Sequence, residues 1–341
     1  MSQGILLGGS GGYGTLPEQV SGFYAARGNA QVTLTWSNPS AEYAGTLIVR
    51  KTGSYPQRPS DGVKIYKGTG TSFIDTGLTN GTQYYYRAFA YNSRGEYQTI
   101  NRIAVATPVA TIPISDLPCG TMIKISYDGT QTKFLIAQQG NPDSSYYDSS
   151  CAGAWIMSQD CIDSYMFDKN YKSFGRSALK QYLESTIFPK FSSALQEKMV
   201  NAMLPVAGST VSCKLFVPSA YELGFITSDM PYQSSYNMTI DGKKSDYFLS
   251  GTGTDACAKR IAYYGGNAIG YWTRTVDVGY SEALGTVYFE YTCGEDGKLN
   301  INSTDITWGT THGVRIEFIV PSSLEVLVQQ DNEGYYTVKE E

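Results

Sequence analysis

The side chains that most often carry acid–base or nucleophilic chemistry are scarce in this sequence. His312 is the single histidine among 341 residues, and histidine is the side chain that ordinarily titrates near neutral pH. One histidine cannot form a multi-histidine metal site. Asp305 could orient His312, but no nucleophile elbow or cysteine–histidine signature accompanies the pair. The sequence therefore predicts that the protein is not an enzyme.

The cysteines do not suggest a metal site either. They stand at positions 119, 151, 161, 213, 257 and 293, with no CxxC pair and no histidine at zinc-ligand spacing. Six cysteines permit three disulfides, but a chain of this length folds without any, and the favoured interpretation is that most are buried free thiols. No cofactor is expected.

Tyrosine is the conspicuous excess, with 28 residues against 13 Phe and 4 Trp. It combines a broad apolar face with a polar tip, which suits recognition surfaces. The net charge is −5 and no basic cluster is present, so nucleic acid is not an expected partner. No apolar run approaches the roughly 18 residues of a membrane span. We expect a soluble recognition protein without membrane insertion.

Composition divides the chain into segments. Residues 1–17 form a flexible arm with six glycines,. Residues 18–108 contain short β-branched and aromatic runs separated by turn residues, which predicts an all-β sandwich of about seven strands. Residues 109–114 are a short, proline-stiffened linker. A domain of mixed strands and helices occupies 115–328, and 329–341 form a tail.

Three motifs mark the N-terminal sandwich. Val32, Leu34 and Trp36 alternate within the VTLTW run, a Leu-x-x-Gly-Thr-x-Tyr run leads from Leu78 to Tyr84, and AFAYN follows. Together they resemble a fibronectin type III domain. The resemblance implies that Trp36 is the core tryptophan, and that the hydroxyl of the corner tyrosine, Tyr84, bonds back to the backbone near Leu78.

The larger domain begins with a hairpin pattern and continues with two helical patterns. Segments 121–125 and 133–137 read as strands joined by a turn at 128–130. Apolar spacing predicts one helix over 177–184 and a second from Ser192 through Met203, stopped by Pro205,. A Gly-, Ser- and Tyr-rich stretch of about fifty residues follows, and long loops of this kind usually carry function.

The order of motifs in this domain matches a known family. The motifs are Ser177 with Leu179, and the segments 191–198, 216–222, 271–275 and 313–315. They resemble a domain of unknown function that is frequent in gut bacteria and their phages, itself similar to the C-type-lectin-like fold of sulfatase-modifying enzymes and phage receptor-binding proteins. Thr275 and Ile316 depart from its Ser and Pro. The resemblance implies a multidomain protein with an α+β C-type-lectin-like domain after the sandwich.

Two interpretations of the aromatic and arginine residues remain open. In the first, Trp272 fills the core, Arg274 hydrogen-bonds loop carbonyls and Arg315 clamps a carboxylate bidentately. In the second, aromatic faces stack on sugar rings in a ligand groove. The candidates for that groove are Tyr263, Tyr264, Tyr271, Trp272, Arg274 and Trp308. Its aromatic members are expected to cluster on or beneath one exposed face.

The expected function of the protein follows from these two family resemblances. The N-terminal sequence lacks the basic and apolar regions of a secretory signal, which favours a virion component made in the bacterial cytoplasm. We expect an adhesive, oligomeric structural protein of a tailed phage or phage-tail-like particle. Its N-terminal side would bind other virion or tail subunits, and its C-terminal domain a host-surface glycan or protein. A capsid decoration or baseplate subunit without receptor binding, or a bacterial surface glycan-binding adhesin, remains an alternative.

Overall fold

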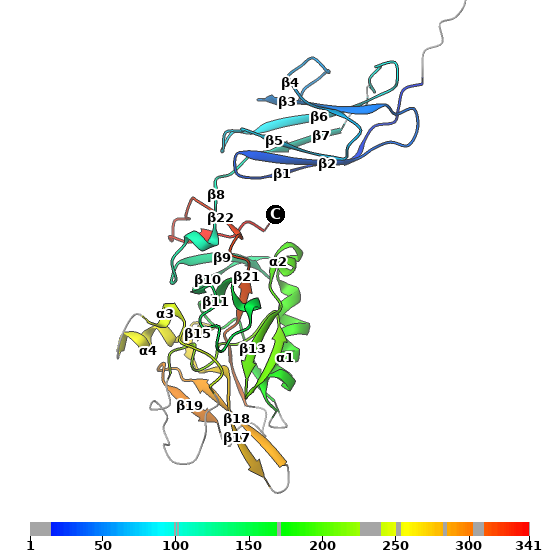
Figure 1. Ribbon diagram of the computed structural model, residues 1–341. Coiled ribbons are helices and arrows are strands. Elements are labelled where there is room, and N and C mark those ends of the chain that lie inside the picture. Colours follow the sequence, from blue (N-terminus) through cyan, green and yellow to red (C-terminus); the bar gives the residue numbers. More distant parts are fainter. Residues whose placement is uncertain are drawn as a thin grey trace, which may run out of the picture. The chain divides into compact units, whose positions relative to one another are not determined.

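The chain folds into two compact units. The computed structural model describes residues 15–98, 100, 102–168, 172–225, 240–249, 254–281, 285–302 and 310–340. The first unit ends at Thr111 and the second runs from Ile112 to Glu340, as Figure 1 shows. The boundary falls within the segment 109–114 that composition marks as a linker.

The first unit is a β-sandwich of seven strands in two sheets (Figure 1). One sheet has the order β1-β2-β5 and the other β4-β3-β6-β7. The strands are β1 Ser21–Arg27, β2 Gln31–Ser37, β3 Gly45–Thr52, β4 Val63–Gly68, β5 Ser72–Thr76, β6 Tyr84–Tyr91 and β7 Arg102–Ala106. This architecture is the all-β sandwich that the sequence predicts.

The core of the sandwich uses the residues that the alternation singled out. Trp36 is buried, and its indole N–H donates to Asn38 Oδ1 at 2.9 Å. Leu78 is buried in the same cluster. The hydroxyl of Tyr84 accepts a hydrogen bond from the amide of Thr79 at 3.1 Å, one residue beyond Leu78. This contact fastens the start of β6 to the chain that precedes it.

A polar contact joins the two sheets of the sandwich. Asp75 on β5 is 5% exposed, and it accepts hydrogen bonds from Arg50 Nη1 at 2.7 Å and from the Tyr86 hydroxyl at 3.0 Å. Arg50 lies on β3 and Tyr86 on β6, so both donors come from the opposite sheet. Buried carboxylates are tolerated only when they are paired in this way.

The second unit contains two five-stranded sheets (Figure 1). The first has the order β21-β11-β10-β9-β23 and the second β12-β20-β17-β18-β19. The strands of the first sheet are β9 Met122–Tyr127, β10 Thr130–Gln139, β11 Ala154–Ser158, β21 Glu317–Val320 and β23 Tyr336–Thr337. Those of the second are β12 Asp163–Met166, β17 Tyr271–Ser281, β18 Gly285–Cys293, β19 Leu299–Asn302 and β20 Thr311–Val314.

Short strands and helices complete this unit. The hairpins are β13 Ala202–Val206 with β14 Ser209–Cys213, and β15 Ala262–Tyr264 with β16 Asn267–Ile269; β8 Thr111–Pro113 and β22 Glu325–Leu327 are further strands. The α-helices are α1 Ala178–Tyr182, α2 Ser193–Lys198, α3 Asp246–Leu249 and α4 Thr254–Arg260. A π-helical turn spans Leu183–Ile187, and 3₁₀ turns span Ile114–Asp116, Ser149–Cys151, Phe174–Arg176 and Phe188–Lys190. None of the described helices is long and apolar enough to cross a membrane.

The expected hairpin at the start of this unit is confirmed. Strands β9 and β10 pair antiparallel up to Tyr127 and Thr130. Asp128 and Gly129 have φ values of +49° and +72°, and a two-residue hairpin turn of the favoured twist needs positive φ at both positions. An aspartate followed by glycine meets that need at little steric cost.

The helix predicted from Ser192 through Met203 is shorter in the structure. Ser192 caps α2 through a hydrogen bond that its side chain accepts from the Leu195 amide, but α2 ends at Lys198 and Ala202–Val206 form strand β13. Leu204 and Val206 are buried whereas Met203 is 37% exposed, which is the two-residue period of a strand. The cause is the hairpin turn at Ala207 and Gly208, both with positive φ, which pairs β13 with β14.

Removing the carboxylate that joins the sandwich sheets should weaken the first unit selectively. We expect Asp75→Ala to lower the free energy of unfolding of this unit by about 2–4 kcal/mol, because it leaves the buried Tyr86 hydroxyl and the Arg50 guanidinium without their acceptor. Scanning calorimetry of the full chain would measure it. Asp61→Ala removes a more exposed pair, with Lys51, and should lower stability less. Equal effects of the two variants would contradict the prediction.

Candidate ligand-binding site

Three of the residues expected to bind a ligand lie on β17 and are buried. Tyr271, Trp272 and Arg274 are 0%, 1% and 0% exposed. The Tyr271 hydroxyl donates to the carbonyl of Arg260 at 2.8 Å, and the Trp272 indole donates to the carbonyl of Tyr165 at 2.7 Å. Side chains buried in this way do not line an exposed groove, so the structure gives these three the packing role instead.

Two of the other candidates lie at the surface. Tyr263 and Tyr264 are 48% and 42% exposed on β15. Trp308 lies outside the described residues. Within the described part of the chain, the expected ligand surface therefore reduces to this tyrosine pair.

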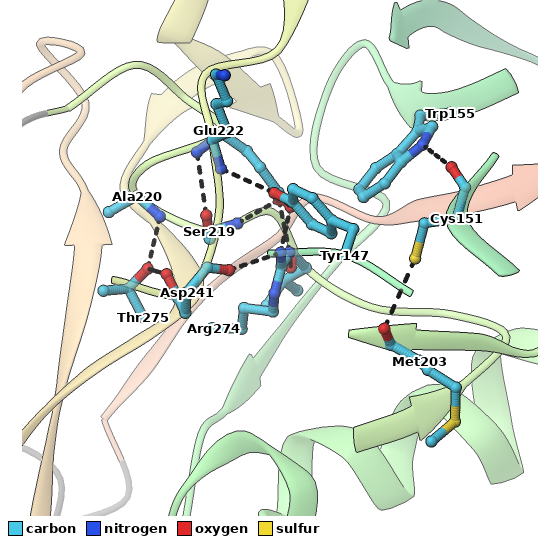
Figure 2. Close-up of polar contacts among 12 residues, drawn as sticks. Tyr147, Cys151, Trp155, Met203, Ser219, Ala220, Glu222, Asp241, Arg274 and Thr275 are labelled. Carbon is cyan, nitrogen blue, oxygen red and sulfur yellow. Dashed lines mark hydrogen bonds and ion pairs between the residues drawn. The ribbon is translucent and has the colours of Figure 1, made fainter. Parts of the chain in front are cut away.

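Arg274 forms a buried ion pair with Glu222, shown in Figure 2. Its Nη1 donates to Glu222 Oε2 at 2.6 Å, and its Nη2 contacts Oε1. The guanidinium also donates to the carbonyls of Val217 at 3.1 Å and Asp241 at 3.3 Å. The expected bonds to loop carbonyls are thus present, together with a bidentate carboxylate clamp that the sequence assigned to a different arginine.

Backbone and tyrosine donors hold Glu222 in place for this pair (Figure 2). Its Oε2 accepts from the Ser219 amide at 2.8 Å, while Ser219 Oγ accepts from the Glu222 amide at 3.0 Å. This reciprocal arrangement is a capping box. The Tyr147 hydroxyl donates to Oε1 at 2.7 Å. The carboxylate is therefore fully engaged, which is the condition under which a buried charge is tolerated.

Asp241 adds a second carboxyl group to the same buried network. Its Oδ1 accepts from the Thr275 hydroxyl at 2.8 Å, and the Ala220 amide donates to Thr275 Oγ1 at 2.7 Å. Among the described residues, Oδ2 has no hydrogen-bond partner. Burial raises the pKa of the Asp241 carboxyl to about 7, against the opposing effect of the Arg274 charge. The network connects β17 to the segments around residues 220 and 241.

Arg315 does not make the carboxylate clamp that we expected. It is 1% exposed, and its Nε donates to the carbonyl of Ser158 at 3.0 Å. Its Nη1 donates to the carbonyl of Arg260 at 3.3 Å and to the Tyr271 hydroxyl at 3.1 Å. The guanidinium also lies 5.3 Å from the centre of the Tyr271 ring. Main-chain carbonyls surround it because three strands and a helix end meet here.

An open pocket lies beside the exposed tyrosine pair. Its volume is about 330 Å³, at the lower end of the range of small-molecule sites,. Its lining residues are Tyr127, Thr132, Lys133, Asp160, Cys161 and Ile162. The Tyr263 amide donates to Asp160 Oδ1 at 3.1 Å, and the Cys161 amide donates to the Tyr263 carbonyl at 3.1 Å. These bonds place β15 at the rim of the pocket.

The wall of the pocket contains a tyrosine that is unusual in its hydrogen bonding. Tyr127 is 7% exposed, and its buried hydroxyl has no hydrogen-bond partner among the residues that the structure describes. Burial, and next the negative charge of Asp163, raise the pKa of this hydroxyl. It therefore stays protonated at neutral pH and can donate as well as accept.

Asp163 accepts hydrogen bonds from two further tyrosines near this wall of the pocket. Its Oδ2 accepts a hydrogen bond from the Tyr182 hydroxyl, and Tyr264 donates to its Oδ1 at 3.4 Å. The rings of Tyr165 and Tyr182 stack at 3.9 Å between centroids with an interplanar angle of 5°. The exposed pair and the pocket are thus parts of one tyrosine-rich surface with carboxylate acceptors.

The sequence analysis did not single out the residues that line this pocket. One signal was available, because Ile123, Ile125 and Tyr127 alternate on β9 and so share the buried face,. That Tyr127 and residues 160–162 line the same pocket could not be inferred from spacing. Their proximity depends on the pairing of β10 with β11, because residues 160–162 follow β11 directly and so lie near the β9–β10 hairpin.

The part of the chain that the structure describes holds no group of three or more metal-ligating side chains. His312 instead packs edge-on against the Trp272 ring, with 4.5 Å between centroids.

Comparison with known proteins identifies a family for the C-terminal part. Residues 152–322 match the family described as "Domain of unknown function (DUF6273)". No curated protein matches the chain. Among solved structures, "Structure of FN3tt mut" is 23% identical with a TM-score of 0.22, covering 27% of this chain and 97% of that one. The spore cortex lytic enzyme SleM of Clostridium perfringens is 13% identical with a TM-score of 0.23, covering 27% of this chain and 28% of that one.

Breaking the buried ion pair should destabilise the second unit strongly. We expect Arg274→Met to lower the free energy of unfolding by about 3–5 kcal/mol, because Glu222 is then buried without its cation. The double variant Arg274→Met with Glu222→Met should cost less than the sum of the single variants, since no charge remains buried alone. Denaturant unfolding measures these values.

The control for this pair is Lys298→Met, which removes an exposed pair with Asp296 and should have little effect. Additive single and double variants would show that Arg274 and Glu222 do not act as a unit.

Asp241 should make stability depend on pH in a defined direction. Because the folded-state pKa of Asp241, about 7, lies above its value in the unfolded chain, the folded state binds the proton more tightly. Its contribution to stability is therefore lost as the pH rises toward 7. Relative to Asp241→Asn, the wild type should lose about 2–3 kcal/mol of stability between pH 5 and pH 8. Unfolding curves of both proteins at the two pH values test this, and a constant difference would contradict it.

Proposed function

We propose that this chain, which belongs to the DUF6273 family through residues 152–322, is a non-enzymatic recognition protein that binds a host-surface glycan or protein through its second unit. The observation that carries the proposal is an open pocket whose lining residues Asp160 and Cys161 hydrogen-bond the main chain of β15, the strand with the exposed Tyr263 and Tyr264. Exposed aromatic side chains beside a preformed pocket are typical of binding sites.

The second unit is, in this proposal, an α+β domain with a C-type-lectin-like fold. The motifs of the resembling family occur in the same order on defined elements. Ser177 caps α1, Ser192 caps α2, and the 219–222 capping box follows. Strand β17 with Arg274 comes next, and Gly313 lies on β20. Each motif has a packing role, which supports a shared framework.

The setting that we propose is the particle of a tailed phage or a phage-tail-like assembly. It rests on the resemblance of the sequence motifs in the second unit to a domain of unknown function that is frequent in gut bacteria and their phages. The protein is made in the bacterial cytoplasm and bound through its N-terminal side to other virion or tail subunits, in an oligomeric arrangement. The sandwich acts as a spacer, and the second unit reaches the host surface.

The proposal contains no catalytic step. Burial raises the pKa of the Cys161 thiol to about 12 and that of Cys293 to about 11. These thiols are protonated at neutral pH and are poor nucleophiles. The residues at the pocket can interact with a ligand through hydrogen bonds and aromatic contacts.

The test is binding of the full-length protein to intact host cells and to purified envelope glycans. We expect saturable binding by the wild type and a loss of about tenfold or more in the double variant Tyr263→Ala with Tyr264→Ala, because truncated aromatic residues at a binding surface often remove more than 1 kcal/mol. Tyr146→Ala is the matched control, since Tyr146 is 43% exposed and does not line the pocket.

Wild-type protein that binds no cell or glycan but associates tightly with other particle proteins would contradict the proposal. The protein would then be a structural subunit of the particle.

A further inference from the structure

We propose that the outer face of the four-stranded sheet in the first unit binds an acidic polysaccharide, a sugar chain along which carboxylate or phosphate groups repeat. The sheet consists of β4, β3, β6 and β7 (Figure 1). The inference goes beyond the proposed function, because that function depends on the pocket of the second unit and this site lies in the sandwich.

Strand pairing gathers four cations onto one face of this sheet. Residues that pair directly across neighbouring strands point to the same side. Leu47, Val49 and Lys51 alternate along β3 and so share one side of the sheet,. The register pairs Val49 with Lys64 and Arg87, Leu47 with Lys67, and Lys51 with Tyr85. We call this side the cationic face, and its cations are Lys51, Lys64, Lys67 and Arg87.

The cationic face is the outer face of the sandwich. Ile48, Tyr86 and Ala88 point to the other side of the same strands and lie in the core between the two sheets. Lys64 and Lys67 are exposed, and Lys51 and Arg87 are partly exposed. The four cations come from three separate strands, so no run of basic residues in the sequence reveals the face.

Most of these cations have no neighbouring anion. Lys51 pairs with Asp61 at 2.9 Å, but among the described residues no carboxylate pairs with Lys64, Lys67 or Arg87. Residues 1–111 contain nine Lys and Arg against five Asp and Glu, although the whole chain has a net charge of −5. The cationic face holds most of this positive surplus, and it therefore attracts an anionic partner.

The spacing of the cations favours a polymer over a single anion. Neighbouring strands lie about 4.8 Å apart and residues rise about 3.3 Å along a strand. Lys64 and Arg87 are two strands apart, and Lys67 is three residues beyond Lys64 on β4, so each of these steps is about 10 Å. One carboxylate or phosphate cannot pair closely with all three. Each exposed contact contributes little alone, whereas repeated acidic groups on one chain add their contributions.

Aliphatic side chains beside the cations suit the sugar part of such a polymer. Ile103 and Val105 on β7 are 45% and 38% exposed. Their cross-strand partners are Arg87 and Tyr85, so both belong to the cationic face. They provide accessible apolar area for the C–H groups of sugar rings that lie between the acidic groups.

The tyrosines of this face argue against a nucleic acid as the polymer. Single-stranded nucleic acids bind where aromatic rings offer their faces to the bases. Here the rings pack against one another, since Tyr85 meets Tyr55 edge-on at 4.9 Å between centroids, and Tyr97 meets Tyr91 at 5.8 Å. Lys67 lies over the Tyr91 ring, 4.9 Å from its centre. The face thus offers cations and aliphatic area rather than a stacking platform.

The test is binding of the full-length protein to immobilised polygalacturonate, which carries carboxylates, and phosphomannan, which carries phosphates. Neutral dextran and single-stranded DNA are the comparisons. We expect the wild type to bind at least one acidic polysaccharide at about 0.05 M NaCl and to lose most of that binding at about 0.3 M NaCl, because exposed charges are screened. The double variant Lys64→Gln with Lys67→Gln should bind about tenfold more weakly or less. It should melt like the wild type, since both lysines are exposed,.

Arg102→Gln is the matched control for the single variant Lys64→Gln. Arg102 is exposed, but it pairs with Ala88, which points to the opposite side of the sheet, so this variant should bind like the wild type. Equal weakening in the two single variants would mean that net charge alone causes binding and would overturn the inference. Binding to neither acidic polysaccharide, equal binding to dextran, or preference for DNA would also overturn it.

A second copy of the chain is the remaining occupant to exclude. Sedimentation velocity of the wild type and of the double variant decides this, and self-association that the two lysine substitutions abolish would replace the polysaccharide by the acidic second unit of a neighbour. Failure here is separate from failure of the proposed function. The double variant Tyr263→Ala with Tyr264→Ala should still bind the acidic polysaccharide, because it leaves the cationic face intact.

Discussion

The buried pair of Arg274 and Glu222 is the interaction on which the second unit depends most. Two opposite charges removed from water are stable together only if most of their remaining hydrogen-bonding positions are filled. Here Ser219, Tyr147 and two main-chain carbonyls fill them, and Arg274 Nε alone of the guanidinium nitrogens has no partner among the described residues. Because these partners belong to separate segments, the pair fixes the position of those segments relative to β17. Loss of either charge would release all of them at once.

Arg315 links the chain segments that carry the pocket residues and the exposed tyrosines. It joins the carbonyl of Ser158, at the end of β11, to that of Arg260, just before β15. The chain after Ser158 supplies Asp160 and Cys161 to the pocket, and β15 carries the exposed tyrosine pair. The adjoining Gly313 is also explained, since a Cβ there would lie 2.5 Å from the sulfur of Cys161. Residues with structural roles thus set the distance between the pocket and its rim.

Much of the framework could be predicted from local patterns, and the pocket could not. Alternation in the VTLTW run and the Asp128-Gly129 turn depend on neighbouring residues alone, so β2 and the β9–β10 hairpin were foreseen. The 202–206 segment was misassigned because Met199, Ala202 and Met203 fit a helical spacing, and only pairing with β14 decides for a strand. The lack of a partner for Tyr127 is a property of the folded surroundings, to which residues 160–163 and 182 contribute, and no sequence spacing reports it.

Several buried polar atoms of the second unit have no partner among the described residues, and the cost of their burial is met in different ways,. Asp241 Oδ2 and Glu317 Oε2 lack partners among the described residues, yet both carboxyl groups are buried, and burial raises the pKa of each. Protonation removes their charge and so lowers the cost of burial. The Tyr127 hydroxyl has no such relief, because it is already neutral at physiological pH. The same holds for the Tyr221 hydroxyl, which also lacks a partner among the described residues. A proton thus lowers the cost of burial for the two carboxyl groups, whereas the two phenol hydroxyls keep that cost.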